Sequence, residues 1–170
     1  LGVNDISFSD LQNSKLKIIN QYAFSQTGIE RIILPPSVNE MGEGVFYNCE
    51  NLESFKIERR IGSNTNSDTY TYIEEIPNKC FYNCKSLSIE NEDFNNLYDN
   101  TSSIKKFGDY AFYNCIGITN LNNVLPSKLT TIGKSCFVGT SIAGILTTPD
   151  ELQIIKDSAF ANLTGISKVI

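Results

Sequence analysis

The tetrapeptide Phe-Tyr-Asn-Cys occurs three times in this chain of 170 residues, at 46–49, 81–84 and 112–115. A string of four residues does not recur three times in so short a chain by accident, so it marks an internal repeat. A repeat predicts a stack of similar units that share one continuous core, because a single unit cannot bury its own apolar side chains. We therefore expect a stack with an outer surface, and not one globule with a central cleft.

Six units become visible when the chain is aligned on the phenylalanine of this string. The six anchor phenylalanines are Phe24, Phe46, Phe81, Phe112, Phe137 and Phe160. The apolar residues five positions before the anchors are Ile19, Met41, Ile76, Phe107, Ile132 and Ile155. A chain keeps such spacings when every unit places the same side chains in the same interior layer. Both positions are therefore predicted to lie in the core.

The repeat length follows from the intervals between successive anchors, which are 22, 35, 31, 25 and 23 residues. The basic unit is near 23 residues, and the two long intervals contain polar insertions at 58–72 and 90–103, which we interpret as exposed loops. A single repeat domain is predicted over the whole chain. It comprises a partial unit at 1–15 and six units at 16–37, 38–72, 73–103, 104–128, 129–151 and 152–170.

Each unit is predicted to contain a short strand and a tight turn. Segments such as 29–34 and 52–57 alternate β-branched and polar residues, which is typical of strands. Strands of successive units would pair in parallel at about 4.7–4.9 Å. The anchor segments are too short for more than a helical or 3-10 turn. Three glycines four positions before an anchor, Gly42, Gly108 and Gly133, indicate a tight bend or a positive φ there.

The repeat resembles that of the BspA-like leucine-rich repeat family, whose units look like L-x-x-I-G-x-x-A-F-x-x-C-x-x-L-x-x-I-x-I-P. The segments 104–121 and 129–145 match best, and the resemblance covers 16–170. It implies a right-handed leucine-rich repeat solenoid, mainly β, with a parallel sheet on one side. Members are typically surface or secreted proteins of bacteria and some protozoan parasites, associated with adhesion. The resemblance therefore implies an extracellular or cell-surface location and a host or extracellular-matrix protein as partner.

Composition excludes several other classes of protein. The net charge is −5 and no basic stripe is present, which disfavours nucleic acid as a partner. No apolar run approaches the ~20 residues that a membrane-spanning helix needs. The chain begins with Leu1 and starts and ends inside a strand of the repeat, so we expect it to be a piece of a longer protein.

The chain offers few of the groups that catalysis needs. It contains no histidine, the commonest general base and metal ligand, so we expect no enzyme, no cofactor and no metal site. The neighbouring carboxylates at 74–75 and 150–151 are interpreted as solvated surface. Paired carboxylates alone can hydrolyse glycosides, so composition leaves this one chemistry open.

The cysteines are interpreted as packing residues. Cys49, Cys84 and Cys115 share one repeat position, where threonine or leucine stands in the other units. Cys80 and Cys136 share another, where alanine or valine stands. Buried free thiols fit such substitutions. A disulfide between stacked neighbours is conceivable, but side chains one strand apart miss the favoured Cβ separation of about 3.8 Å, so none is predicted.

Two further positions of the repeated string have a structural and a functional interpretation. The asparagines of this position, Asn48, Asn83, Asn114 and Asn162, either bind backbone groups in their own turns or form a row of ligand-binding amides. The first interpretation is favoured. The tyrosines Tyr47, Tyr82 and Tyr113 either cover the core with their hydroxyls in water or form an exposed aromatic stripe that binds a protein or a glycan.

The remaining candidate site is the outer face of the predicted sheet. Side chains between the interior strand positions should point outward, and the candidates are Arg31, Ile33, Ser54, Lys56, Asn120, Asn122 and Leu146. Ile145, in contrast, is assigned to the interior. The insertions add Tyr70, Tyr72, Phe94 and Tyr98, which either contact a partner or seal the edge of the core.

Two functions remain for such a chain. One is a non-catalytic protein-binding scaffold, as in an adhesion or host-interaction domain. The other is a structural spacer that displays or separates other domains. An outward patch with apolar side chains favours the scaffold, whereas uniformly polar outward positions would favour the spacer.

Overall fold

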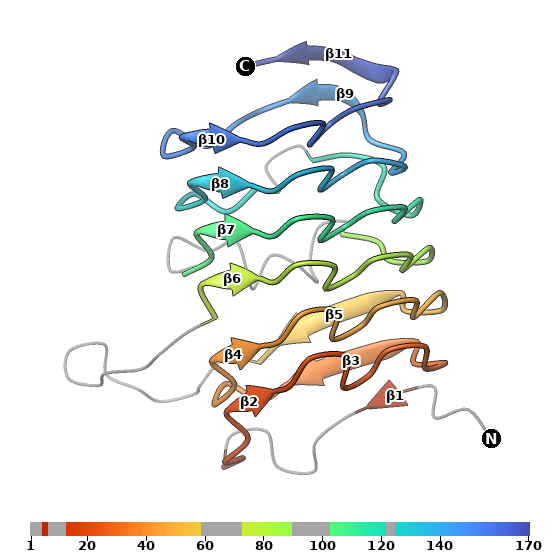
Figure 1. Ribbon diagram of the computed structural model, residues 1–170, viewed down its shortest axis with the longest axis vertical. Coiled ribbons are helices and arrows are strands. Elements are labelled where there is room, and N and C mark those ends of the chain that lie inside the picture. The colour runs from red at the N-terminus through yellow and green to blue at the C-terminus, as the bar shows by residue number, and fades with distance from the viewer. Residues whose placement is uncertain (1–4, 7–12, 59–72, 90–102, 122–124) are drawn as a thin grey trace.

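The computed structural model describes residues 5–6, 13–58, 73–89, 103–121 and 125–170. In these ranges the chain winds into a solenoid of parallel strands, as the repeat predicts (Figure 1). Each coil is named below after its anchor phenylalanine. The described ranges contain no helix, so the expected helical turn at each anchor is replaced by hydrogen-bonded turns.

Two-residue strands line one side of the coils. They are β2 (Ile18–Ile19), β4 (Glu40–Met41), β6 (Glu75–Ile76), β7 (Lys106–Phe107), β8 (Thr131–Ile132) and β10 (Ile154–Ile155). β2 pairs with β4, and β6, β7, β8 and β10 form a second parallel sheet. The second residue of each strand is the apolar residue five positions before an anchor. The sequence did not predict these strands, because two residues carry no measurable period.

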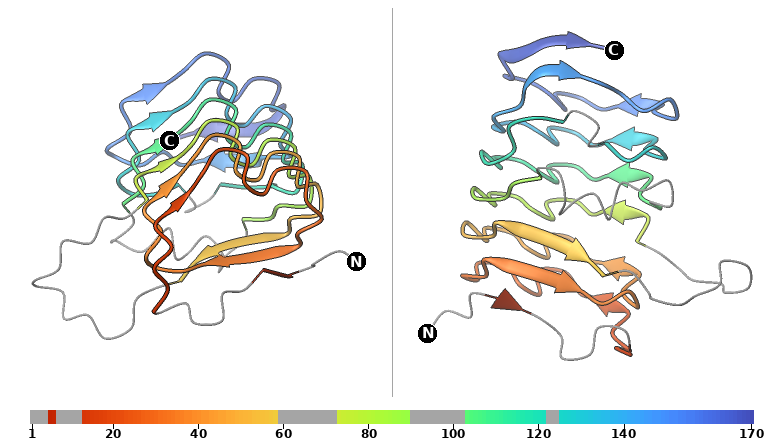
Figure 2. Two further views of the ribbon diagram at one scale, coloured as in Figure 1. Left: turned by 60° about the horizontal axis from the view of Figure 1, so that its bottom comes forward. Right: turned by 180° about the vertical axis from the view of Figure 1, so that it is seen from behind.

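A second set of strands, all but one of them longer than two residues, lies on another side of the coils (Figure 2). β1 (Asp5–Ile6), β3 (Arg31–Leu34) and β5 (Ser54–Ile57) form one parallel sheet, and β9 (Ala143–Leu146) pairs with β11 (Gly165–Val169). The strands predicted at 29–34 and 52–57 are therefore confirmed, with Ile32 beside Phe55. Within 118–121 no strand forms, so the prediction of a strand position at Asn120 is wrong.

The inward and outward positions of β9 differ from the prediction by one residue. Leu146, predicted to face outward, is 3% exposed, whereas Ile145, predicted to be interior, is 43% exposed. Gly144 has a φ of +86°, and the register between β9 and β11 shifts between Ile166 and Lys168. A positive φ rotates the backbone out of the regular pleat, so the alternation of side chains slips by one.

A backbone hydrogen-bond ladder joins the anchor segments of all six coils. The N–H of each of the first five anchors donates to the carbonyl of the residue before the next anchor, at 2.8–3.0 Å. Residues two before and two after every anchor have a positive φ, and they are Tyr22, Gln26, Gly44, Asn48, Lys79, Asn83, Tyr110, Asn114, Ser135, Gly139, Ser158 and Asn162. These left-handed residues turn alternate N–H groups toward the next coil, which a helical turn does not do.

The glycines four positions before an anchor have a different role from the one predicted. Gly42, Gly108 and Gly133 do not have a positive φ. A Cβ at Gly108 would lie 2.5 Å from the backbone nitrogen of Asn78, and one at Gly42 would lie 2.3 Å from that of Gln21. Glycine is therefore required here because the backbones of successive coils approach closely, and not for its conformational freedom.

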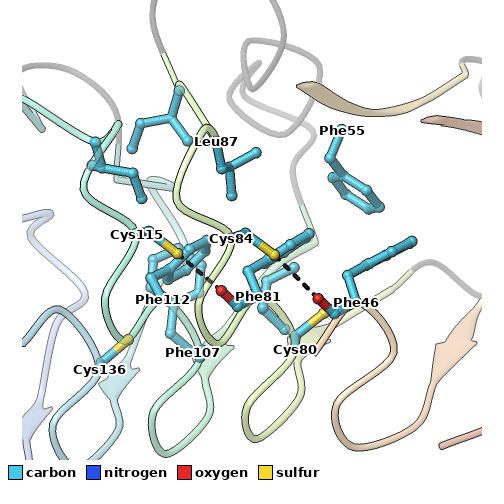
Figure 3. Packing of buried hydrophobic residues seen from close by; sticks show 14 of the residues in the cluster. Phe46, Phe55, Cys80, Phe81, Cys84, Leu87, Phe107, Phe112, Cys115 and Cys136 are labelled. Carbon is cyan, nitrogen blue, oxygen red and sulfur yellow. Dashed lines mark hydrogen bonds between the residues drawn. The ribbon is translucent and has the colours of Figure 1, made fainter. Parts of the chain in front are cut away.

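The core is a continuous stack of the anchor rings. Successive anchor rings lie 5.2–5.6 Å apart between centroids, with interplanar angles of 1–14°. Phe46, Phe81, Phe112 and Phe137 are almost completely buried, and Phe55 and Phe107 pack edge-on against the stack (Figure 3). The core prediction is confirmed for all anchors except the partly buried Phe24 and Phe160 of the end coils.

One junction lacks part of the short-strand ladder. Gly42, Gly108, Gly133 and Lys156 each donate their N–H to the previous coil, at 2.8–2.9 Å. Pro77 stands at the equivalent position of the Phe81 coil and has no N–H to donate. The described residues contain no pairing between β4 and β6, which lie visibly farther apart than β6 and β7 (Figure 1).

Candidate functional site

Two columns of side chains flank the anchor stack on its outer side. The residues one position after the anchors are Ser25, Tyr47, Tyr82, Tyr113, Val138 and Ala161. Those two positions before the anchors are Tyr22, Gly44, Lys79, Tyr110, Ser135 and Ser158. The aromatic members lie together on the first four coils. We define the tyrosine surface as Tyr22, Tyr47, Lys79, Tyr82, Tyr110 and Tyr113.

The tyrosine rings of this surface pack on one another. The centroids of Tyr47 and Tyr82 lie 4.9 Å apart and those of Tyr82 and Tyr113 lie 4.8 Å apart, with interplanar angles of 16° and 5°. Tyr22 meets Tyr47 edge-on at 5.9 Å, and Tyr110 lies 5.8 Å from Tyr113. The stack fixes each ring while its outer edge stays accessible, since all three stacked tyrosines are only half-buried.

A small polar network holds one end of the surface. The Tyr22 hydroxyl and the Lys79 ammonium both donate to Oε1 of Glu43, each at 2.7 Å. The bond from Lys79, followed by that from Tyr22, holds the pKa of Glu43 below its usual value. The same bonds to Glu43 raise the pKa of Tyr22 and of Lys79. At neutral pH this part of the surface is therefore a compensated ion pair and not a free charge.

A hollow of about 590 Å³ opens in the tyrosine surface. Its lining residues are Tyr22, Tyr47, Lys79, Tyr82 and Tyr110. Gly44, between Tyr22 and Lys79 in its column, contributes no side chain. The Tyr22 ring leans over this glycine, so closely that a Cβ there would lie 2.3 Å from its Cε1. Four tyrosine rings therefore line the hollow, and the missing side chain of Gly44 leaves room for one of them, Tyr22.

The hydroxyls of the stacked tyrosines are available to a partner. Among the described residues, the rings of Tyr47, Tyr82 and Tyr113 contact one another, but their hydroxyls have no hydrogen-bond partner. Burial, followed by the nearby Tyr113, raises the pKa of Tyr82, so its hydroxyl stays protonated at neutral pH. The surface therefore presents a row of phenolic donors one coil apart. This geometry fits both interpretations of the tyrosines. The surface also includes Tyr22, Lys79 and Tyr110, which the sequence did not reveal because their position changes residue type from coil to coil.

The asparagines form a ladder of their own. Asn83 donates its amide to Oδ1 of Asn48 at 3.0 Å, and Asn114 donates to Oδ1 of Asn83. These side chains bind one another, so neither the predicted bonding to their own turns nor a row of free ligand-binding amides describes them. Asn162, in the last coil, is exposed.

The five cysteines are buried free thiols, which agrees with a packing role. They also join coils. Cys49, Cys84 and Cys115 each donate a weak hydrogen bond to the carbonyl of the previous anchor, at 2.9–3.1 Å. Figure 3 shows the bonds of Cys84 and Cys115. Burial raises the pKa of Cys84 and Cys115 well above the usual thiol value, so both stay protonated. Threonine at this repeat position in two other coils was the sequence signal for a donor. Thr27 and Thr140, however, bond to the carbonyl of the anchor in their own coil.

The predicted sheet-face residues come together only in part. Arg31, Ile33, Ser54 and Lys56 are neighbours on β3 and β5, where Arg31 is exposed and lies 3.4 Å from Glu53. The other predicted members do not extend this patch. Asn120 lies outside any strand and Leu146 is buried. The remaining predicted residues, Asn122, Tyr70, Tyr72, Phe94 and Tyr98, lie outside the described residues.

A second, polar cleft of about 680 Å³ lies at the junction of β4 and β6. Its carboxylates are largely paired, because Glu43 bonds Lys79, Glu74 bonds Lys105 and Glu75 bonds Lys106, at 2.7–2.8 Å. In the described ranges no three histidine, cysteine or acidic side chains gather in a way that could hold a metal. No helix in these ranges has the length and apolar character to cross a membrane.

Similar solved structures support the fold. A leucine-rich cell-surface protein from Faecalibacterium prausnitzii is 21% identical, with a TM-score of 0.59 over 91% of this chain and 42% of that chain. A leucine-rich repeat protein of T. pallidum is 20% identical, with a TM-score of 0.60 over 91% of this chain and 62% of that chain. The chain thus spans less than two thirds of either protein.

Comparison with curated proteins gives no significant match. The family model described as the BspA-type leucine-rich repeat region, of six copies, matches residues 3–99 and 71–170. These two matches together span nearly all of the sequence, and the described coils have the strand order and parallel pairing that such repeats form. The chain therefore belongs to the BspA-type leucine-rich repeat family.

Proposed function

We propose that this repeat domain is a non-catalytic scaffold that binds a protein through the tyrosine surface. The observation that carries the proposal is the hollow between Tyr22 and Tyr82, bordered by a row of hydroxyls that bond to none of the described residues. Tyrosine is enriched at protein interfaces because a rigid ring buries much area while its hydroxyl still bonds. The stacked rings lose little conformational entropy on binding, since they are already held in place.

The proposal extends to an extracellular or cell-surface location and to a host or extracellular-matrix protein as partner. The support is family membership, together with the cell-surface protein of F. prausnitzii that shares the fold. A non-catalytic role is supported by the family, whose solenoids are generally scaffolds, and by a sequence without histidine.

The test is a binding screen of the purified domain against extracellular-matrix and serum proteins. For any partner found, Tyr82→Ala is expected to weaken binding at least tenfold, because it opens the middle of the aromatic stack. The matched variant Lys56→Ala, on the β3–β5 face, is expected to leave binding within twofold. If Lys56→Ala and Arg31→Ala abolish binding while Tyr82→Ala does not, the site lies on the sheet face and this assignment is wrong.

A spacer function is the second candidate. The anchor ladder runs unbroken through all six coils, which suits a stiff rod that separates other domains. The spacer is favoured if the screen finds no partner whose binding depends on any surface residue.

A further inference from the structure

We propose that the tyrosine surface binds a proline-rich segment in the polyproline II conformation. This inference rests on the protein-binding function proposed above and names the kind of partner. Three independent features of the surface support it: the spacing of its stacked rings, the kind of hydrogen-bonding group that it presents, and the shape and charge of its hollow.

The spacing of the stacked rings matches one turn of polyproline II. The steps of 4.9 Å from Tyr47 to Tyr82 and 4.8 Å from Tyr82 to Tyr113 together span about 9.7 Å along a straight stack. Polyproline II rises about 3.1 Å per residue with three residues per turn, so its carbonyls return to the same face about every 9.3 Å. In a β-strand the groups on one face repeat about every 6.6 Å. This matches neither the distance between neighbouring stacked rings nor twice that distance.

The hydrogen-bonding groups on the two sides are also complementary. Proline has no N–H, and polyproline II makes no internal hydrogen bonds, so a proline-rich segment presents carbonyl acceptors that need donors from outside. Tyr47, Tyr82 and Tyr113 present hydroxyl donors without partners among the described residues. A helix does not use such donors, because its carbonyls are bonded internally.

The hollow suits an apolar, uncharged ligand. Its lining is aromatic, with Tyr22 turned edge-on to Tyr47, and a proline ring packs well against such walls. Of the described residues that line it, Lys79 alone is charged, and its ammonium lies 2.7 Å from Oε1 of Glu43. Because this charge is compensated, the surface does not require a charged partner, and a run of prolines carries no side-chain charge.

The experiment measures fluorescence anisotropy of a fluorescein-labelled decaproline peptide, with a labelled Gly-Ser decapeptide as the non-polyproline control. Wild-type protein is expected to bind decaproline saturably and at least tenfold more tightly than the control. Tyr82→Ala is expected to weaken binding more than tenfold. The double variant Tyr47→Phe with Tyr113→Phe keeps both rings and removes two donors, so a loss of about five- to tenfold is expected.

Lys128→Ala, at an exposed position outside the tyrosine surface, is the matched control and should bind like wild type. Thermal unfolding of each variant identifies any loss that comes from misfolding, and the phenylalanine variant retains the stack. Equal binding of decaproline and the Gly-Ser peptide overturns the proposal. If a screened protein then still binds in a way that depends on Tyr82, the partner is a folded protein surface and the proposed protein-binding function stands. If a glycan binds in a way that depends on Tyr82, the partner is a carbohydrate and the proposed protein-binding function is wrong.

Discussion

Asn83 combines a left-handed backbone conformation with side-chain hydrogen bonds to both neighbouring coils. Its φ of +60° is in the left-handed region, which asparagine tolerates better than most residues. Its amide also donates to Asn48 and its oxygen accepts from Asn114, so it uses both halves of the side chain. Gly139 occupies the same position in a later coil with a φ of +77°. The backbone conformation is therefore the constant requirement, and the amide is an addition to it.

This distinction predicts different costs for two substitutions. Asn83→Gly removes the amide bonds but fits the backbone, so a loss of about 1–2 kcal/mol is expected. Asn83→Ala removes the same bonds and adds about 1 kcal/mol of left-handed strain. Urea unfolding of both variants measures the difference. Equal stabilities would show that strain at this position has no cost.

The Tyr22–Glu43–Lys79 network predicts a stability that depends on pH. The pKa of Glu43 is lowered in the folded state, so its contribution is present above the unfolded pKa and disappears as the pH falls through the folded one. The pKa of Tyr22 is raised, so its contribution is present at neutral pH and disappears as the pH rises above 10. Melting temperatures of wild type and Glu43→Gln should therefore differ at pH 7 and converge once the pH has fallen below the lowered pKa of Glu43. A difference that persists in acid would rule out this carboxylate as the cause.

At the scale of the element, the close approach of consecutive coils is the controlling feature. A Cβ at Gly108 would meet the backbone of Asn78 at 2.5 Å, whereas one at Gly28 would meet nothing within 4 Å. Gly28 also lacks a positive φ, which makes it a matched control.

Gly108→Ala is accordingly expected to destabilise the fold by about 1–3 kcal/mol, because the backbone of one coil must shift. Gly28→Ala is expected to be neutral or slightly stabilising. The measurement is again urea unfolding. A neutral Gly108→Ala would mean that the coils separate without cost, contrary to their continuous hydrogen-bond ladder.

An element can be predicted from the sequence when its residue pattern recurs at the same position in several coils. The anchor stack and the strands β3 and β5 recur at fixed spacing, and both were predicted. The two-residue strands were not predicted, because they arise from backbone pairing between neighbouring coils and not from a residue pattern. The positions of Ile145 and Leu146 were exchanged because Gly144 interrupts the pleat. Half of the tyrosine surface was missed, because Tyr22 and Lys79 share a position that holds a different residue in most coils.

At the scale of the whole molecule, stability is a sum of neighbouring contacts. The core of each coil packs against the coils beside it, so a defect in the middle breaks two interfaces and a defect at an end breaks one. Among the described residues, Phe81 stacks on both Phe46 and Phe112, whereas Phe24 stacks on Phe46 alone.

Phe81→Ala is therefore expected to cost about 3–5 kcal/mol, and Phe24→Ala clearly less. Chemical denaturation followed by circular dichroism measures both losses. Equal losses would show that the stack responds as one rigid body rather than coil by coil.

The proline at position 77 also matters when the molecule is pulled. A force along the axis of the stack is carried at each junction by the backbone hydrogen bonds that cross it, and the junction before the Phe81 coil lacks the short-strand bonds that other junctions have. This joint is expected to yield first, with the first two anchored coils separating from the last four while each block keeps its own core. For a protein that holds a partner under flow, such a joint would extend under load before the remaining coils unfold.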